Sequence, residues 1–199
     1  MNRSITRLSI AALCALIFSS CAIGQSRISV THSPLAPASK QRSGTVVVRT
    51  FTDSRKDIDK TLVGNKRNGF GMVLGSFAIK GGDTVAEVLT AHFAEALTAA
   101  GYKAVVSNSA SGSAVLSGDI HEFWLDLFTA VWHNVGIKLQ LKDGAGRVVW
   151  SKDVNTKETN VLWFGVNSEI EKVIRQALDK ALTQTVREFA SDAFASKVR

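Results

Sequence analysis

The sequence predicts an α+β fold, in which a mixed, mostly antiparallel sheet carries two helices on one face. Two stretches have apolar residues at helical spacing, and Val135 to Leu141 alternates apolar residues with glycine or polar ones, as a half-buried strand does. The 199 residues are 45% hydrophobic and 21% charged and include two prolines, which is typical of a globular domain. The expected element order is β–α–β–β–β–α.

The first twenty residues have the layout of a secretory signal peptide. Arg3 and Arg7 precede an uncharged stretch, Leu8 to Phe18, that is too short to span a bilayer. Residues 17–21 (IFSSC) resemble the lipobox of bacterial lipoproteins, in which cleavage leaves an acylated cysteine at the N-terminus. This predicts a signal peptide over residues 1–20 and lipidation of Cys21. An ordinary signal peptide that is cleaved a few residues later is the alternative.

A linker is expected between the anchor and the domain. Residues 21–43 are predicted to be the lipidated N-terminus and a linker, and residues 44–199 a single α+β domain, because residues 22–43 hold both prolines and no acidic residue. Within the linker, Ile28 to Val30 could pair as an edge strand. Ala22 follows the cysteine where an aspartate would hold a lipoprotein at the inner membrane, so the sequence resembles the outer-membrane case.

The first half of the domain contains a strand, a loop and a glycine-rich stretch. Thr45 to Phe51 is rich in β-branched residues, which predicts a buried strand. Residues 53–68 are polar and charged, which predicts a surface loop. Gly64 to Gly82 holds six of the fifteen glycines, and it is expected to be a glycine-kinked strand or a hairpin.

The first helix is expected to begin after Thr84. Thr84 and Glu87 have the spacing of a capping box, an apolar stripe runs from Val85 to Ala100, and Gly101 is the expected stop.

The second half of the domain reads as strands followed by a helix. Lys103 to Ser107 is a short strand, and Ala114 to Phe128 is a long strand whose apolar face switches near Glu122, as at a bulge. After the alternating strand, the turn at residues 143–146 leads into a strand over Val148 to Thr156.

The last helix is expected to open with a second capping box, formed by Ser168 and Glu171. Its apolar stripe consists of Ile170, Val173, Ile174, Ala177, Leu178, Ala181, Leu182, Val186 and Phe189.

Several short motifs together resemble the YajG-type family of small bacterial lipoproteins. These are Cys21, Ile28-Ser29-Val30, Asp53-Ser54-Arg55, Ala100-Gly101-Tyr102, the stretch Val115 to Ile120, the Asp143-Gly144 turn and the amphipathic C-terminal helix. The resemblance spans nearly all of the chain after the signal peptide. It implies a lipoprotein anchored in the bacterial outer membrane, with no established activity. The residues around Cys21 predict that this lipoprotein faces the periplasm.

Motifs for catalysis or nucleotide binding are incomplete in this sequence. Gly64 and Gly69 are spaced as in a phosphate-binding loop, but Phe70 and Gly71 follow where Lys and Ser or Thr are required. The sequence has no G-x-S-x-G motif, and after removal of the signal peptide it keeps no free cysteine. We therefore expect no enzyme, no cofactor and no nucleotide.

The four histidines are too scattered to predict a metal site. His121-Glu122 does not continue as H-E-x-x-H, and His92 falls in an apolar helical stripe, where a packed and hydrogen-bonded histidine is expected. His133 could lie across the sheet from His121. An enzyme would need such a pair together with a carboxylate in a cleft. No metal ligand is predicted.

The formal charge of +7 does not indicate a nucleic-acid partner, because no basic stripe interleaved with aromatic residues is present. The expected membrane contact is the lipid anchor.

Aromatic residues in and between the later strands are the strongest indication of a binding surface. Trp124, Trp132, Trp163 and Phe164 belong to apolar clusters, and exposed apolar patches and tryptophans are typical of protein interfaces. The alternative is that these side chains close the open end of the core.

Asp53 and Arg55, at the start of a loop, are further candidates for contacting a partner, or else they fix the loop by hydrogen bonds. The expected function is therefore non-catalytic docking on an envelope protein. The alternative is binding of a small amphipathic ligand, such as a lipid or a peptidoglycan fragment, in a cavity beneath the tryptophans.

Overall fold

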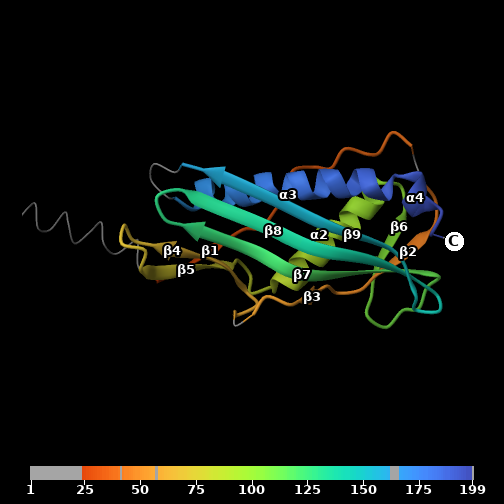
Figure 1. The fold of residues 1–199 in the computed structure, drawn as a ribbon, viewed down its shortest axis with the longest axis horizontal. Coiled ribbons are helices and arrows are strands. Elements are labelled where there is room, and N and C mark those ends of the chain that lie inside the picture. The colour runs from red at the N-terminus through yellow and green to blue at the C-terminus, as the bar shows by residue number, and fades with distance from the viewer. Residues whose placement is uncertain (1–23, 41, 57, 162–165, 199) are drawn as a thin grey trace, which may run out of the picture.

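A mixed sheet with two long helices on one face forms the frame of the molecule (Figure 1). This computed structural model describes residues 24–40, 42–56, 58–161 and 166–198. The strands in these ranges are β1 (Gly24–Ile28), β2 (Thr45–Val48), β3 (Thr52–Asp53), β4 (Leu62–Arg67), β5 (Val73–Ile79), β6 (Lys103–Val106), β7 (Ala114–Leu127), β8 (Val131–Asp143) and β9 (Val148–Asn160). The helices are α2 (Val85–Ala99), α3 (Asn167–Phe189) and the short α4 (Asp192–Ala195).

The long strand β7 is the axis of the sheet. On one side it pairs with β8 in an antiparallel meander that continues to β9. On the other side its first half pairs in parallel with β2, and beyond β2 lies β6. Its second half pairs in parallel with β4, which continues through β5 to β1. The predicted α+β class and mostly antiparallel sheet are confirmed. Four strands lie between α2 and α3, as the individually predicted strands indicate, which is one more than the order β–α–β–β–β–α contains.

The predicted bulge in β7 is present. The pairing of β7 with β8 shifts between Ile120 and Glu122, so one extra residue is inserted there. Ile120 and Phe123 are both buried, although they are three positions apart and strict alternation would put them on opposite faces. The bulge therefore keeps both halves of a long strand directed at the same core.

The capping box of α2 forms as predicted. The hydroxyl of Thr84 accepts a hydrogen bond from the Glu87 backbone N–H at 3.3 Å, and the Glu87 carboxylate accepts one from the Thr84 N–H at 2.8 Å. This cap directs the apolar stripe of α2 into the core, where Leu89 and Phe93 are fully buried.

The predicted capping box of α3 is wrong, although its apolar stripe is buried as expected. The helix begins at Asn167, so Ser168 lies inside it, and the N-cap residue Val166 makes no side-chain capping bond. The Glu171 carboxylate instead accepts a hydrogen bond from the backbone N–H of Ser29 at 2.8 Å. The Glu171 carboxylate, which the sequence pattern predicts as an acceptor in the cap of α3, is therefore bonded to a segment distant in sequence.

The linker predicted over residues 21–43 is wrong for residues 24–40, which pack against the domain. The edge strand considered for Ile28 to Val30 forms four residues earlier, as β1 (Gly24–Ile28). β1 pairs in parallel with β5, and Ile28 and Val30 are buried. The segment then crosses the helices: Ser33 donates to Asp179 of α3 through both its N–H and its hydroxyl at 2.7 Å, and the Ala38 N–H donates to the Ala99 carbonyl at 2.9 Å. Apolar residues spaced along this proline-containing stretch cover the helix pair and hold it in place.

The glycine-rich stretch forms the hairpin of β4 and β5, so part of the predicted surface loop at 53–68 is a strand. The strands approach closely at two glycines. A Cβ atom at Gly64 would collide with the backbone of Leu125 in β7, and one at Gly75 would collide with the Gly24 carbonyl in β1. Within the described ranges, no helix has the length and apolar content that crossing a membrane requires.

Candidate functional site

Two tryptophans lie on the sheet face that points away from the helices. Phe123 and Leu125 point into the core, so Trp124 between them points outward. Trp124 is opposite Asn134 and Trp132 is opposite Asp126, which makes the two tryptophans diagonal neighbours on adjacent strands. Both rings are half-buried, so each presents apolar area to the solvent. We call Trp124 and Trp132 the tryptophan face.

Hydrogen bonds hold the polar neighbours of the tryptophan face. Arg67 Nε donates to Asp126 Oδ1 at 2.8 Å, and Asn134 Nδ2 donates to Glu122 Oε1 at 2.7 Å. The ion pair is about one-third exposed, so it adds little stability. The result is an apolar centre with a fixed polar rim, which is the composition of many protein interfaces.

One end of the sheet exposes large apolar side chains, and we call these the apolar end: Phe70, Met72, Val73, Phe128, Val161 and Val166. Phe70 and Met72 belong to the β4–β5 turn, and Phe70 is 90% exposed. Phe128 belongs to the β7–β8 turn, and Val161 follows β9.

The strand pairings show that these turns share one end. Lys66 pairs with Leu127, and Val131 pairs with Asn160, so the β4–β5 turn, the β7–β8 turn and the end of β9 lie together, at the left in Figure 1. The sequence predicts a glycine-kinked strand or a hairpin for the stretch that contains Phe70 and Met72, but it does not predict their exposure. The available signal was the presence of large apolar side chains between turn glycines.

The chain enters the domain at this same end. Gly24, the first residue of β1, pairs with Gly75, two residues from Val73 at the apolar end. Cys21 precedes Gly24 by three residues, a length of chain that spans at most about 10 Å. Cys21 itself lies outside the described residues, as do the predicted site residues Trp163 and Phe164.

Asp53 and Arg55 form a buried ion pair. Their side chains are only 5% and 2% exposed, and Arg55 Nη2 donates to Asp53 Oδ2 at 2.7 Å. Arg55 Nη1 also donates to the carbonyls of Leu62 at 2.8 Å and Phe123 at 2.9 Å. Burial opposes ionisation of Asp53, but the hydrogen bonds and charge of Arg55 outweigh it and keep the pKa of Asp53 below its usual value. The pair holds the loop against β4 and β7 and offers little surface to a partner.

His121 and His133 do not come together, because they point to opposite faces of the sheet. His133 is fully buried against Phe123, with ring centroids 4.7 Å apart, and burial lowers its pKa to about 3. Neither ring nitrogen of His133 has a hydrogen-bond partner among the described residues. His121 is exposed on the outer face, 3.3 Å from Asn155 Oδ1. The cleft that an enzyme would need at this pair is therefore not formed.

A cavity of about 390 Å³ lies between residues 35–39 and α3, and its lining includes Leu35, Pro37 and Val186. This cavity is lined by neither Trp124 nor Trp132. It does not correspond to the cavity beneath the tryptophans that a small amphipathic ligand was expected to occupy.

No protein-family model and no curated protein sequence matches this chain. Several solved structures match its fold. A Xanthomonas campestris protein of the DUF330 family has a TM-score of 0.59 and 17% identity, with 87% of this chain and 95% of that one covered.

A putative neuraminyllactose-binding hemagglutinin homolog from Helicobacter pylori has a TM-score of 0.53 and 11% identity, over 86% of this chain and 95% of that one. An uncharacterized protein has a TM-score of 0.54 and 11% identity, over 84% of this chain and 99% of that one. At these identities the similarity establishes the fold alone.

Proposed function

We propose that this protein is a non-catalytic lipoprotein of the bacterial outer membrane, anchored through Cys21 and facing the periplasm, which docks on another protein of the cell envelope. The observation that carries the proposal is the coincidence of the apolar end with the entry point of the chain. A lipidated Cys21 holds Gly24 within about 10 Å of the membrane surface. The exposed side chains of the apolar end then face the bilayer.

The short tether gives the domain a defined orientation. If residues 24–40 were a free linker, the domain could tumble at the end of its anchor and present any face. Because β1 is paired with β5 and the following segment is bonded to both helices, the tether is reduced to the residues that precede Gly24. Several acyl chains anchor a protein stably, so this orientation persists.

The tryptophan face is the proposed contact for the protein partner. Trp132 is one residue from the start of β8 and therefore adjacent to the apolar end. The anchor keeps Trp132 and Trp124 at a fixed distance from the membrane surface. A partner protein on the same membrane can contact them there. Tryptophan is strongly enriched among the residues that dominate binding energy at interfaces, and these two lie together on an open strand pair.

The absence of catalysis is part of the proposal, and the buried polar groups support it. The ion pair of Asp53 and Arg55 is buried and fixes the loop that contains it. His133 is buried in the core, on the opposite face of the sheet from His121. Neither constellation presents an activated group to a substrate. The chemistry of the described surface favours binding.

In-cell photo-crosslinking tests the proposed docking. A photoreactive amino acid replaces Trp132 in the full-length, lipidated protein, and the adducts are identified by mass spectrometry after irradiation of living cells. The matched control replaces Lys138, which is exposed on the same face of β8 but farther from the apolar end. We expect one dominant protein adduct at position 132 and a much weaker one at position 138.

Two results contradict docking on a protein. One is that position 132 gives lipid adducts alone, and the other is that both positions give equal adducts. Either result would favour binding of a small amphipathic ligand over docking on a protein. Loss of the membrane-bound protein in a Cys21→Ser variant is expected in addition. If this variant stays in the membrane fraction, the proposed anchor is wrong even if docking occurs.

A further inference from the structure

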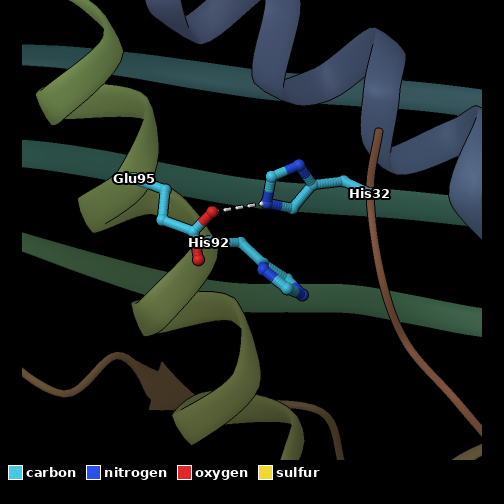
Figure 2. A group of neighbouring side chains, drawn as sticks. All are labelled: His32, His92 and Glu95. Carbon is cyan, nitrogen blue, oxygen red and sulfur yellow. Dashed lines mark hydrogen bonds and ion pairs between the residues drawn. The ribbon is translucent and has the colours of Figure 1, made fainter. Parts of the chain in front are cut away.

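Two histidines and a glutamate form a cluster between the N-terminal segment and α2 (Figure 2). His32 comes from the segment that follows β1, whereas His92 and Glu95 lie one turn apart on α2. One ligand atom from each of the three residues lies within 4.8 Å of the other two. The closest pair is His32 Nε2 and Glu95 Oε2, at 3.0 Å.

Backbone carbonyls fix which ring nitrogen faces the cluster. His92 Nε2 is 3.1 Å from the Val30 carbonyl oxygen, and His32 Nδ1 is 2.7 Å from the Ser33 carbonyl oxygen. A carbonyl can only accept, so each of these nitrogens carries the hydrogen. His92 Nδ1 then has a free lone pair, and His32 Nε2 is directed at Glu95. Metal-binding histidines are oriented in the same way, by an outer acceptor on the opposite ring nitrogen.

The remaining nitrogen of His92 lacks a protein partner. Nδ1 is buried and makes no hydrogen bond within the described residues, which is uncommon for a buried polar atom. The His32 ring lies edge-on to the His92 ring, with centroids 4.6 Å apart. A ligand between the two rings and Glu95 would satisfy this atom.

We propose that His32, His92 and Glu95 bind one divalent transition-metal ion. Two imidazoles and one carboxylate are a common ligand set for Zn²⁺. Ligand atoms at tetrahedral Zn²⁺ are about 3.3 Å apart, so the 3.0 Å spacing of His32 and Glu95 already fits. Because the His92 ligand atom lies within 4.8 Å of the other two, its ring has to approach by at most about 1.5 Å. Glu95 is 61% exposed, so water has access to the fourth position.

The proposed ion fastens the N-terminal segment to α2. In the metal-free protein, His32 Nε2 already lies 3.0 Å from Glu95 Oε2, and a bound ion would join these two atoms to His92. Metal binding to the folded state raises its stability by mass action. The segment that connects the anchor to the domain is therefore held more tightly when the site is filled. This inference does not depend on the docking function.

Metal titration tests the site. The full-length lipidated protein in detergent is stripped with a chelator and titrated with Zn²⁺ against a chromophoric competitor. We expect one ion per chain, and at least tenfold weaker binding in Glu95→Gln and in His92→Gln. Co²⁺ at the same site should give the visible absorption of a tetrahedral complex. The control is His121→Gln, an exposed histidine outside the cluster, which should bind as the wild type does.

Thermal unfolding separates a lost ligand from a lost fold. Glu95 is on the surface of α2, so Glu95→Gln should unfold at nearly the same temperature as the wild type without metal. At the same Zn²⁺ concentration, the unfolding midpoint of the wild type should rise more than that of Glu95→Gln. The inference is overturned if no stoichiometric binding occurs, or if Glu95→Gln and His121→Gln affect binding equally.

Discussion

Arg55 shows how a single buried side chain can organise a loop. Its guanidinium neutralises Asp53 and also satisfies the carbonyls of Leu62 and Phe123, which belong to different strands. The sequence motif located this pair, and its alternative interpretation as a loop-fixing contact is the one seen in the hydrogen bonds. Burial could not be foreseen, because it depends on β4 and β7 closing over the motif.

We expect Arg55→Ala to destabilise the fold by about 3–5 kcal/mol, because it leaves the Asp53 carboxylate buried without a counter-charge. Urea unfolding measures the change. The matched control is Arg67→Ala, which breaks the partly exposed pair with Asp126 and should cost about 1 kcal/mol or less. Equal losses in the two variants would contradict the account of Arg55.

His133 makes the stability of the fold sensitive to acid. It stays neutral in the folded protein, since burial lowers its pKa from 6.5 to about 3, whereas the unfolded chain takes up a proton below pH 6.5. The free energy of unfolding therefore decreases as the pH falls from 6.5, the pKa in the unfolded chain, toward about 3, the pKa in the folded protein. Glu158 is opposite His133 on β9, but its carboxylate is engaged by Lys180 of α3.

Between pH 7 and pH 5, protonation of His133 in the unfolded chain should lower the free energy of unfolding of the wild type by about 2 kcal/mol, since one pKa unit corresponds to about 1.4 kcal/mol. His133→Leu, of similar volume, should remove this part of the slope, and chemical unfolding at a series of pH values measures it. His121→Leu, at an exposed histidine, should leave the slope unchanged. A slope in His133→Leu as steep as in the wild type would show that other groups cause the acid sensitivity.

At the scale of elements, the sequence predicted correctly those features whose interacting residues are close together in the chain. The cap of α2 and the bulge in β7 each depend on neighbouring residues, and both were predicted. The attachment of Ser29 and Ser33 to α3 was not predicted, because their hydrogen bonds reach Glu171 and Asp179, more than 140 positions away. The same contact explains the failed capping box of α3, since Glu171 binds Ser29.

Gly75 is expected to control the attachment of β1. A Cβ atom at this position would meet the Gly24 carbonyl, so Gly75→Ala should separate the start of β1 from β5. Hydrogen exchange of the β1 amides should become at least tenfold faster. Gly69→Ala is the control, because a Cβ atom there has no neighbour within 4 Å among the described residues. Unchanged exchange in Gly75→Ala would contradict the close approach of the two strands.

At the scale of the whole molecule, the first described residue of the chain, Gly24, and the apolar end coincide. Sequence reasoning selected Trp124 and Trp132, and the structure places both on the open face of the sheet. It did not select Phe70, Met72 or Phe128, because their common location depends on how three separate turns align. The proposed orientation of the domain on a membrane therefore depends on the assembled sheet and could not be predicted from the sequence.

The most direct test of this account measures the depth of the two ends of the sheet relative to a bilayer. Cysteines introduced as Phe128→Cys and Val148→Cys are the only free thiols after acylation of Cys21 and loss of Cys14 with the signal peptide. Both native residues are exposed, and Val148 follows the β8–β9 turn at the opposite end. Nitroxide labels on lipidated protein in phosphatidylethanolamine–phosphatidylglycerol vesicles report their access to dissolved oxygen and to a water-soluble nickel complex.

The account predicts that the label at position 128 is more accessible to oxygen, which concentrates in the bilayer, and that the label at position 148 is more accessible to the nickel complex. Equal exposure of both labels to the nickel complex, or the reverse order, would contradict the proposed orientation.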